Sequence, residues 1–399
     1  MINKKKLNIS NSNKIYKSAI KIIPSGGQTY SKGVTQFTEG FAPKYLDRGK
    51  GAYVTDVDGN TFLDYVMACQ PLIFGYSDKD INKAVIRQLA KGTSFSLQNK
   101  LEVDVSKLLI KNVPSAEMVR FGKNGADATS VAVKIARAYT KRDHIAYCGY
   151  HGWHDWYISK TDLNGGIPKF NQKLLHSFNY NDLGSLEKIF KKFKNKIAAV
   201  IMEPITVYTP GCYGPKNCKN KNCKIFCKKN FLKKVKDLAH KNNALLIFDE
   251  IVTGFRYSIG GAQELTNVTP DLTALAKAMS NGIPISAIVG KKKYMKSLAK
   301  TFFSFTYGGD CIGLAAAKAS ITKIKKLNVP DHINKVGLIL KNGLNKIINT
   351  YELRDYFECI GYPCRSIFVF KGNGVFNELE MKTFLQQELF RRGILWAAY

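Results

Sequence analysis

The stretch ALLIFDEIVTGFR, residues 244–256, is an unbroken apolar run that ends in two carboxylates, Asp249 and Glu250. Such a run is typical of a strand that is buried on both faces of a parallel sheet. Similar runs occur elsewhere as EMVRF, HIAYC, IAAVIM and SAIVG, and the segments between them have the period of amphipathic helices at 126–140, 183–193 and 229–242. We therefore predict an α/β fold with a large, mostly parallel sheet covered by helices on both faces.

The flanking regions predict a smaller lobe. Residues GAYVTDVDGNTFLDYV alternate around Asp58-Gly59, which is a strong hairpin signal. Further helices are expected at 79–92, 101–112, 311–326 and 330–349, and a last strand and helix in SIFVF and NELEMKTFLQQELFRRG. We predict an N-terminal segment with the hairpin at 1–75, a large domain at 76–325 and a small C-terminal domain at 326–399. Because GILWAAY ends in what looks like a strand, we expect that small domain to be incomplete.

Composition excludes several classes of protein. The 399 residues carry a net charge of +31, but the 51 lysines are spread along the whole chain, so we expect no dedicated nucleic-acid partner. No apolar run is long enough for a membrane helix, and the first residues lack the apolar region of a signal peptide. With an odd number of cysteines, nine, the chain is expected to be cytoplasmic, in a reducing compartment, with no membrane partner.

Two residues point to chemistry. Asp249 ends a buried strand at the sheet edge where ligands of α/β proteins bind, and a buried carboxylate there requires a cation. Lys277 lies among Ala276, Ala278 and Met279, where loss of solvent would lower its pKa and make it nucleophilic. A cofactor with a cationic ring nitrogen and an aldehyde, pyridoxal phosphate, fits both. The alternative is that Asp249 caps a helix and Lys277 extends into solvent.

Two further segments favour the cofactor. RFGKNGADATSVAVKIARAYT, residues 120–140, is a strand, a glycine turn and a helix start, whose free N–H groups can bind a phosphate. Tyr150-His151-Gly152-Trp153 follows the next strand and offers a ring that can stack on a heteroaromatic cofactor; a buried aromatic cluster is the alternative.

These residues resemble one family. YVTDVDGNTFLDY, YHG, FDEIVTGFR, GGAQE with VTPDLTALAKAM, and TYGGD are similar to motifs of the class III pyridoxal-phosphate aminotransferases of fold type I. Within that family the chain looks like glutamate-1-semialdehyde aminomutase and related enzymes of polysaccharide and amino-sugar gene clusters. The resemblance implies a fold type I transferase: a large domain with a seven-stranded type of sheet, and a small α+β lobe built from both terminal segments.

The resemblance also implies roles for individual residues. Lys277 would form the Schiff base and, once displaced, act as the general base, and Asp249 would pair with the pyridinium nitrogen. Tyr150 and Ile251 would contact the two faces of the ring. The other expected cofactor contacts are Asn124, Gly125 and Ala126 at the phosphate, His151 and Glu203 beside the site, and Thr306 from the neighbouring subunit of a homodimer.

The substrate positions depart from the aminomutases. A serine and an arginine expected near the N-terminus are Thr29 and Lys32, a Trp-Gly pair is Cys69-Gln70, and an asparagine is Tyr208. We therefore predict an aminotransferase that passes an amino group from a small-molecule donor to a carbonyl acceptor, a sugar or small carbonyl metabolite. Glutamate-1-semialdehyde aminomutase, an isomerase, is the alternative, and a non-catalytic scaffold is a third possibility that retention of Lys277 and Asp249 disfavours.

One cysteine cluster is not explained by the resemblance. CYGPKNCKNKNCKIFC carries Cys212, Cys218, Cys223 and Cys227 within sixteen residues. Four thiolates can surround one structural zinc ion, but the chelating pair usual in zinc sites is missing. A solvated loop of free thiols is the preferred interpretation.

Overall fold

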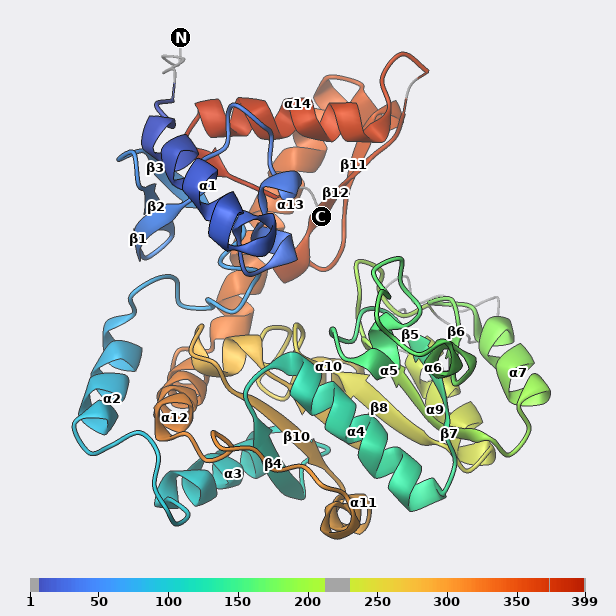
Figure 1. Ribbon diagram of the computed structural model, residues 1–399. Helices are drawn as coiled ribbons and strands as arrows, with labels where there is room; N and C mark the ends of the chain where they lie inside the picture. Colours follow the sequence, from blue (N-terminus) through green and yellow to red (C-terminus); the bar gives the residue numbers. More distant parts are fainter. Residues whose placement is uncertain (1–6, 212–229, 373, 398–399) are drawn as a thin grey trace. The chain divides into compact units, whose positions relative to one another are not determined.

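The computed structural model describes residues 7–211, 230–372 and 374–397 (Figure 1). The chain divides into two compact units. The larger comprises Lys83–Lys341 and Ile360–Ile367, and the smaller comprises Met1–Asn82, Asn342–Cys359 and Phe368–Tyr399. Each unit is described separately below.

The larger unit contains a seven-stranded sheet. Its strands lie in the order β4, β10, β9, β8, β7, β5, β6. The four pairings from β9 to β6 are parallel, whereas β10 runs antiparallel to both of its neighbours. The prediction of a mostly parallel sheet is confirmed. The strand bounds are β4 Met118–Gly122, β5 His144–Cys148, β6 Leu175–Ser177, β7 Ile197–Met202, β8 Leu245–Asp249, β9 Leu272–Leu275 and β10 Ser286–Gly290.

The two faces of this sheet are covered by different helices. On one face, Val131 and Ile135 of α4 pack on Leu245 and Ile247 of β8. On the other, α7 and α9 pack on the alternate residues of the same strand, Leu246 and Phe248. Because side chains alternate along a strand, odd-numbered residues of β8 face α4. Asp249, the last residue of the strand, is also odd-numbered and is therefore on the face that α4 covers.

The predicted helices of this unit are confirmed within a few residues. Several of them start at a capping side chain; the side chain of Asn124, for example, accepts the N–H of Asp127 at the start of α4. Helix α13 (Val329–Thr350) continues into the smaller unit. The other helices are α2 Lys79–Leu89, α3 Lys100–Asn112, α4 Gly125–Thr140, α5 Asp155–Ile158, α6 Lys169–Lys173, α7 Leu183–Lys192, α9 Phe231–Lys241, α10 Ala262–Thr266, α11 Lys292–Met295 and α12 Cys311–Lys326.

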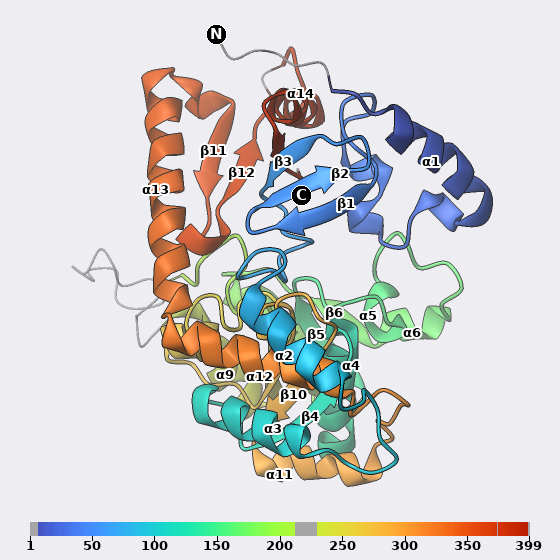
Figure 2. The same cartoon turned by 90° about the vertical axis from the view of Figure 1, so that its left-hand side faces the viewer.

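The smaller unit is built on the predicted hairpin (Figure 2). Strands β2 (Tyr53–Asp56) and β3 (Thr61–Asp64) pair antiparallel, β1 (Leu46–Lys50) pairs with β2, and β13 (Ile394–Leu395) adds to β3 in parallel. Phe62 of β3 and Phe390 meet edge to face in the core of this unit. The remaining elements are α1 Ser10–Ile22, α14 Glu378–Arg391 and the two-stranded sheet of β11 Phe357–Ile360 and β12 Ile367–Phe370.

Two further expectations concern membrane-spanning helices and a metal site. Within the described residues, no helix is long and apolar enough to cross a membrane, and no group of three potential metal ligands is present. The four-cysteine segment, with Cys212, Cys218, Cys223 and Cys227, lies outside the described residues.

Candidate active site

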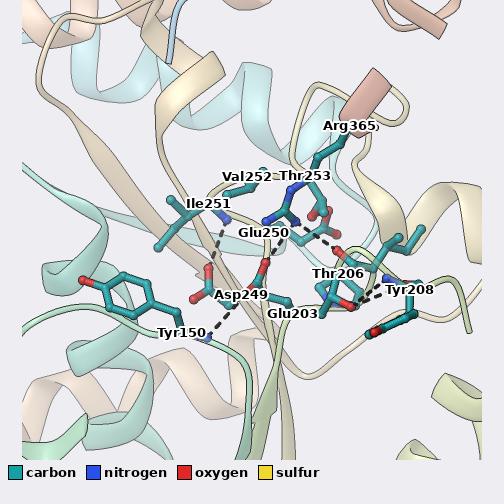
Figure 3. Close-up of polar contacts among 12 residues, drawn as sticks. Tyr150, Glu203, Thr206, Tyr208, Asp249, Glu250, Ile251, Val252, Thr253 and Arg365 are labelled. Carbon is teal, nitrogen blue, oxygen red and sulfur yellow. Dashed lines mark hydrogen bonds and ion pairs between the residues drawn. The ribbon is translucent and has the colours of Figure 1, made fainter. Parts of the chain in front are cut away.

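Asp249 lies at the carboxyl end of β8 and is 3% exposed. Its Oδ2 accepts a hydrogen bond from Nδ1 of His151 at 2.8 Å, and its Oδ1 accepts the backbone N–H of Ile251 at 3.1 Å. Figure 3 shows this carboxylate between the Ile251 side chain and the Tyr150 ring. The backbone N–H is neutral, and an imidazole is charged only when it is protonated, so beside a neutral His151 the buried negative charge still favours a cation.

His151 supports Asp249 and has a defined tautomer. Because an ionised carboxylate only accepts hydrogen bonds, Nδ1 of the imidazole carries a proton, and in the neutral ring Nε2 is then an acceptor. The ring is 1% exposed and lies between Trp156, whose plane is inclined by 15°, and the edge of Tyr157. Among the described residues, His151 Nε2 has no hydrogen-bond partner. The site therefore contains one buried acceptor that protein groups do not satisfy.

Lys277 reaches the same sheet edge through the pairing of β8 with β9. Asp249 is directly opposite Ala274, and Lys277 follows three residues later in the chain. Its φ of 45° is left-handed, a conformation that costs about 1 kcal/mol or more for a side chain with a Cβ and that clusters at functional sites. Its neighbours Ala276, Ala278 and Met279 are buried, as the sequence indicated, while Lys277 itself is half-buried.

The predicted phosphate turn is the N-terminus of α4. Asn124 and Asp127 form a capping box, which leaves the N–H groups of Gly125 and Ala126 without intrahelical acceptors. A Cβ at Gly125 would lie 2.7 Å from Cδ1 of Ile251, and one at Gly152 would lie 2.7 Å from the Cβ of Ala126. Only glycine permits these close approaches, which bring the turn against the residues that follow β5 and β8.

Glu203 follows β7 and forms an ion pair that sequence reasoning missed. Its Oε2 is 3.1 Å from Nη1 of Arg365, and its Oε1 accepts the backbone N–H of Tyr150 at 3.4 Å (Figure 3). Both side chains of the ion pair are less than one-fifth exposed. Arg365 comes from the segment 360–367 of the larger unit, 162 residues from Glu203. No local pattern marks such a contact, because it depends on the tertiary structure.

Glu250, the carboxylate next to Asp249, is held by hydrogen bonds within the protein. Glu250 is fully buried and accepts hydrogen bonds from Thr253, from the backbone of Ala262, and from the backbone and side chain of Gln263. Burial raises the pKa of this carboxyl above its ordinary value, and these hydrogen bonds oppose the rise. Glu250 thus joins β8 to the start of α10 through hydrogen bonds within the protein.

The remaining predicted residues have more exposed environments. Tyr150 and Tyr208 are 62% and 58% exposed, and Thr306 and Asn124 are exposed as well. In the smaller unit, Thr29 and Lys32 are exposed on short 3-10 turns. Gln70 ends a run of four left-handed residues that starts at Met67. The larger unit thus brings together Tyr150, His151, Glu203, Asp249, Ile251, Gly125 and Ala126.

These residues suit pyridoxal phosphate. The buried carboxylate of Asp249 matches a protonated ring nitrogen, and the N-terminus of α4 matches a phosphate. Lys277, at the same edge of the sheet, carries the amine that an aldehyde requires.

Comparison with known proteins gives one consistent result. Residues 37–357 match the family described as aminotransferase class-III. The chain is 36% identical over 398 residues to 3-aminobutyryl-CoA aminotransferase of Cloacimonas acidaminovorans (strain Evry), covering 99% of this chain and 92% of that protein. It is 33% identical over 369 residues to glutamate-1-semialdehyde 2,1-aminomutase of Francisella tularensis subsp. mediasiatica (strain FSC147), covering 89% and 82%.

A solved structure supports the same assignment. The crystal structure of an omega-transaminase from Sphaerobacter thermophilus superposes with a TM-score of 0.76 at 26% identity, covering 97% of this chain and 86% of that one. The likeness covers nearly the whole chain, so it agrees with the family match in fold as well as in sequence. The chain therefore belongs to the class III aminotransferases, a family of pyridoxal-phosphate-dependent enzymes.

Proposed function

We propose that this enzyme transfers an amino group from a small-molecule donor to a sugar or small carbonyl metabolite, with Lys277 as the attachment point of pyridoxal phosphate. The observation that carries the proposal is the pairing of β8 with β9. It brings the buried strand-end Asp249, which accepts hydrogen bonds from His151 and from the N–H of Ile251, to the same edge as Lys277. Pyridoxal phosphate, when bound, supplies an aldehyde for the amine and a ring that withdraws electrons.

Different residues would then have different roles toward the cofactor. Asp249, held by His151 and the N–H of Ile251, would keep the ring nitrogen protonated. Asn124, Gly125 and Ala126 would hold the phosphate. Lys277, once released from the cofactor, would carry a proton between two carbon atoms as the general base. Tyr150, exposed in the isolated chain, and Ile251 would cover the ring.

Arg365 offers an anchor for the carboxylate of the donor. A guanidinium binds a carboxylate through two parallel hydrogen bonds, which Lys32 cannot do. Arg365 is held by Glu203, whose other oxygen contacts the backbone of Tyr150, so the arginine lies beside the proposed cofactor site. An amino acid donor such as glutamate fits this arrangement. Thr29, Lys32, Gln70 and Tyr208 remain proposed contacts for the acceptor.

Two other substrates are alternatives. Glutamate-1-semialdehyde is favoured by the similarity to the aminomutase, although the expected serine and arginine are Thr29 and Lys32 here. A 3-amino acyl thioester of coenzyme A is favoured by the relative that matches 99% of the chain. The phosphates of such a substrate would also suit a protein with a net charge of +31.

We further propose a homodimer in which Thr306 contributes to the phosphate site of the neighbouring subunit. Thr306 is exposed and is followed by the exposed Tyr307, which supports a position at a contact between subunits. Sedimentation of the holoenzyme tests the dimer. A cytoplasmic location remains a prediction from the sequence, which cell fractionation tests.

The decisive experiment is reduction with borohydride followed by peptide mapping. The label should appear on Lys277, and the Lys277→Arg variant should bind the cofactor without becoming labelled. A label on another lysine would refute the assignment. A half-reaction screen with glutamate, a 3-amino acid and its coenzyme A thioester would then identify the donor by conversion to pyridoxamine phosphate. Steady isomerisation of glutamate-1-semialdehyde would instead favour the aminomutase.

A further inference from the structure

A network of linked side chains lies next to the N-terminal turn of α4. Nε1 of Trp156 donates to Oγ of Ser130 at 2.9 Å, and the same Oγ is 2.6 Å from Nδ1 of His154. On its other side, Nε2 of His154 is 3.9 Å from Oδ1 of Asp127. These residues come from α4 and from the segment after β5, and they use none of the groups assigned above to the cofactor ring.

The donors in this hydrogen-bond network are compatible with one particular tautomer of His154. An indole N–H can only donate, so Ser130 accepts from Trp156 and has its own proton available for His154. When Ser130 donates that proton to His154, Nδ1 of His154 is an acceptor, and the proton of the neutral imidazole lies on Nε2, on the side of Asp127. In this arrangement the Ser130 hydroxyl directs the N–H of His154 toward the Asp127 carboxylate.

Asp127 needs such a partner if its helix is to bind a phosphate. Its Oδ2 accepts the backbone N–H groups of Lys123 and Asn124 at 2.8 Å and 3.0 Å, which shapes the turn. The same carboxylate places a negative charge in the first turn, next to the N–H groups that would receive an anion. Lys123 is engaged by Asp310 instead, and in the described part of the chain His154 is the basic side chain within 4 Å of Asp127.

We propose that His154 is a positioning residue for the phosphate of the cofactor, acting through Asp127, and that Ser130 sets its tautomer. The inference rests on the proposed binding of pyridoxal phosphate at Lys277 and adds the residues that make this particular turn, Asn124-Gly125-Ala126, receptive to a dianion. Two other contacts hold the segment in place. Thr129 donates to the carbonyl of His151 at 2.7 Å, and Gly152 allows contact with Ala126.

The test compares two ligands on the apoenzyme prepared from the full chain: pyridoxal phosphate and pyridoxal, which lacks the phosphate. His154→Ala should lower the preference for pyridoxal phosphate over pyridoxal by about tenfold, the size of one interaction between an N–H donor and a charged group. The affinity for pyridoxal should stay unchanged. His154→Gln, which can still donate toward Asp127, should restore most of the preference.

A second variant and a matched control complete the test. Ser130→Ala should lower the preference about threefold, and the double variant should be no worse than His154→Ala, because Ser130 acts through His154. His240→Ala removes another histidine–aspartate pair, with Asp271 at 2.8 Å, on α9, and should leave the preference unchanged. An unchanged preference in His154→Ala, or equal losses for both ligands, would overturn the inference. If the wild-type protein bound neither ligand, the proposed function itself would fail.

Discussion

The two ends of strand β5 each carry a histidine with a hydrogen bond of 2.8 Å, but the partners differ. After the carboxyl end, the buried His151 donates to Asp249. At the amino end, His144 is bonded to His176 of β6, with Phe193 stacked on His176 at 3.8 Å between ring centroids. One pair contains a buried charge and an unsatisfied ring nitrogen, whereas the other can be fully satisfied when neutral. The geometry of a single bond therefore does not distinguish a functional histidine from a structural one.

The amino-end pair is a structural element with a pH limit. A hydrogen bond between two imidazoles requires one of them to accept, so both cannot be charged. Burial, His144, Lys160 and Lys192 lower the pKa of His176 to about 4, and burial and Lys196 lower the pKa of His144. At the carboxyl end, by contrast, the charge on Asp249 is what a cofactor with a cationic nitrogen would use.

The largest expected effect is at the carboxyl end. Asp249→Asn should reduce kcat by about 10² to 10³-fold while the protein stays folded, since removal of one preorganised electrostatic partner costs about 3–4 kcal/mol of barrier. Steady-state kinetics with the donor found in the half-reaction screen, alongside thermal unfolding, measures this. An unchanged kcat would mean that Asp249 is only a structural cap.

A variant of Glu250 tests whether a carboxylate takes part in catalysis merely because it is adjacent to Asp249. Glu250→Gln should lower the free energy of unfolding by about 2 kcal/mol, because the amide can accept fewer of the hydrogen bonds from Thr253, Ala262 and Gln263. Turnover per folded molecule should change less than twofold. Denaturant titration and active-site counting separate the two quantities. A large loss of kcat with normal stability would place Glu250 in the chemistry.

His151 should have an intermediate effect. His151→Phe keeps an aromatic ring but leaves Asp249 without its donor, and we expect about a tenfold loss in kcat, equivalent to one hydrogen bond to a charged group. His151→Asn can place an N–H near the position of Nδ1 and should recover part of the loss. If both variants behave identically, the hydrogen bond from His151 is not what supports Asp249.

The smallest effect is expected at the amino end, and only on stability. A histidine whose pKa is lowered on folding binds its proton mainly in the unfolded state, so stability is lost as the pH falls from about 6.5 toward 4. His176→Gln should remove on the order of 1 kcal/mol of that loss, a value reduced for partial exposure, and should leave kcat at neutral pH unchanged. Unfolding curves at pH 4.5 and pH 7 measure it; an identical pH dependence in variant and wild type would refute this role.

The comparison also shows which parts of the site the sequence could predict. The apolar run before Asp249 and the glycine turn before α4 are local patterns, and the expected strand and helix are present there. The small residues around Lys277 are also a local pattern, and Ala276, Ala278 and Met279 are buried. The antiparallel direction of β10 and the short strand β9 were not predicted, because four apolar residues can belong to a strand or to a turn. Arg365 was missed for a different reason: its partner, Glu203, is 162 residues away.

The sequence by itself determined the order of strands and helices along the chain, the hairpin at Asp58-Gly59, and the presence of a strand-end carboxylate and a lysine among small residues. These features follow from the period of side chains along a helix or strand and from the conformations that glycine allows. Only the tertiary structure decided that Asp249 accepts a hydrogen bond from His151 and that Glu203 pairs with Arg365. The same holds for the contact of Ser130 with His154 and for the position of His154 near Asp127. The order of strands in the sheet determines those contacts, and no local pattern of side chains encodes which distant strands become neighbours.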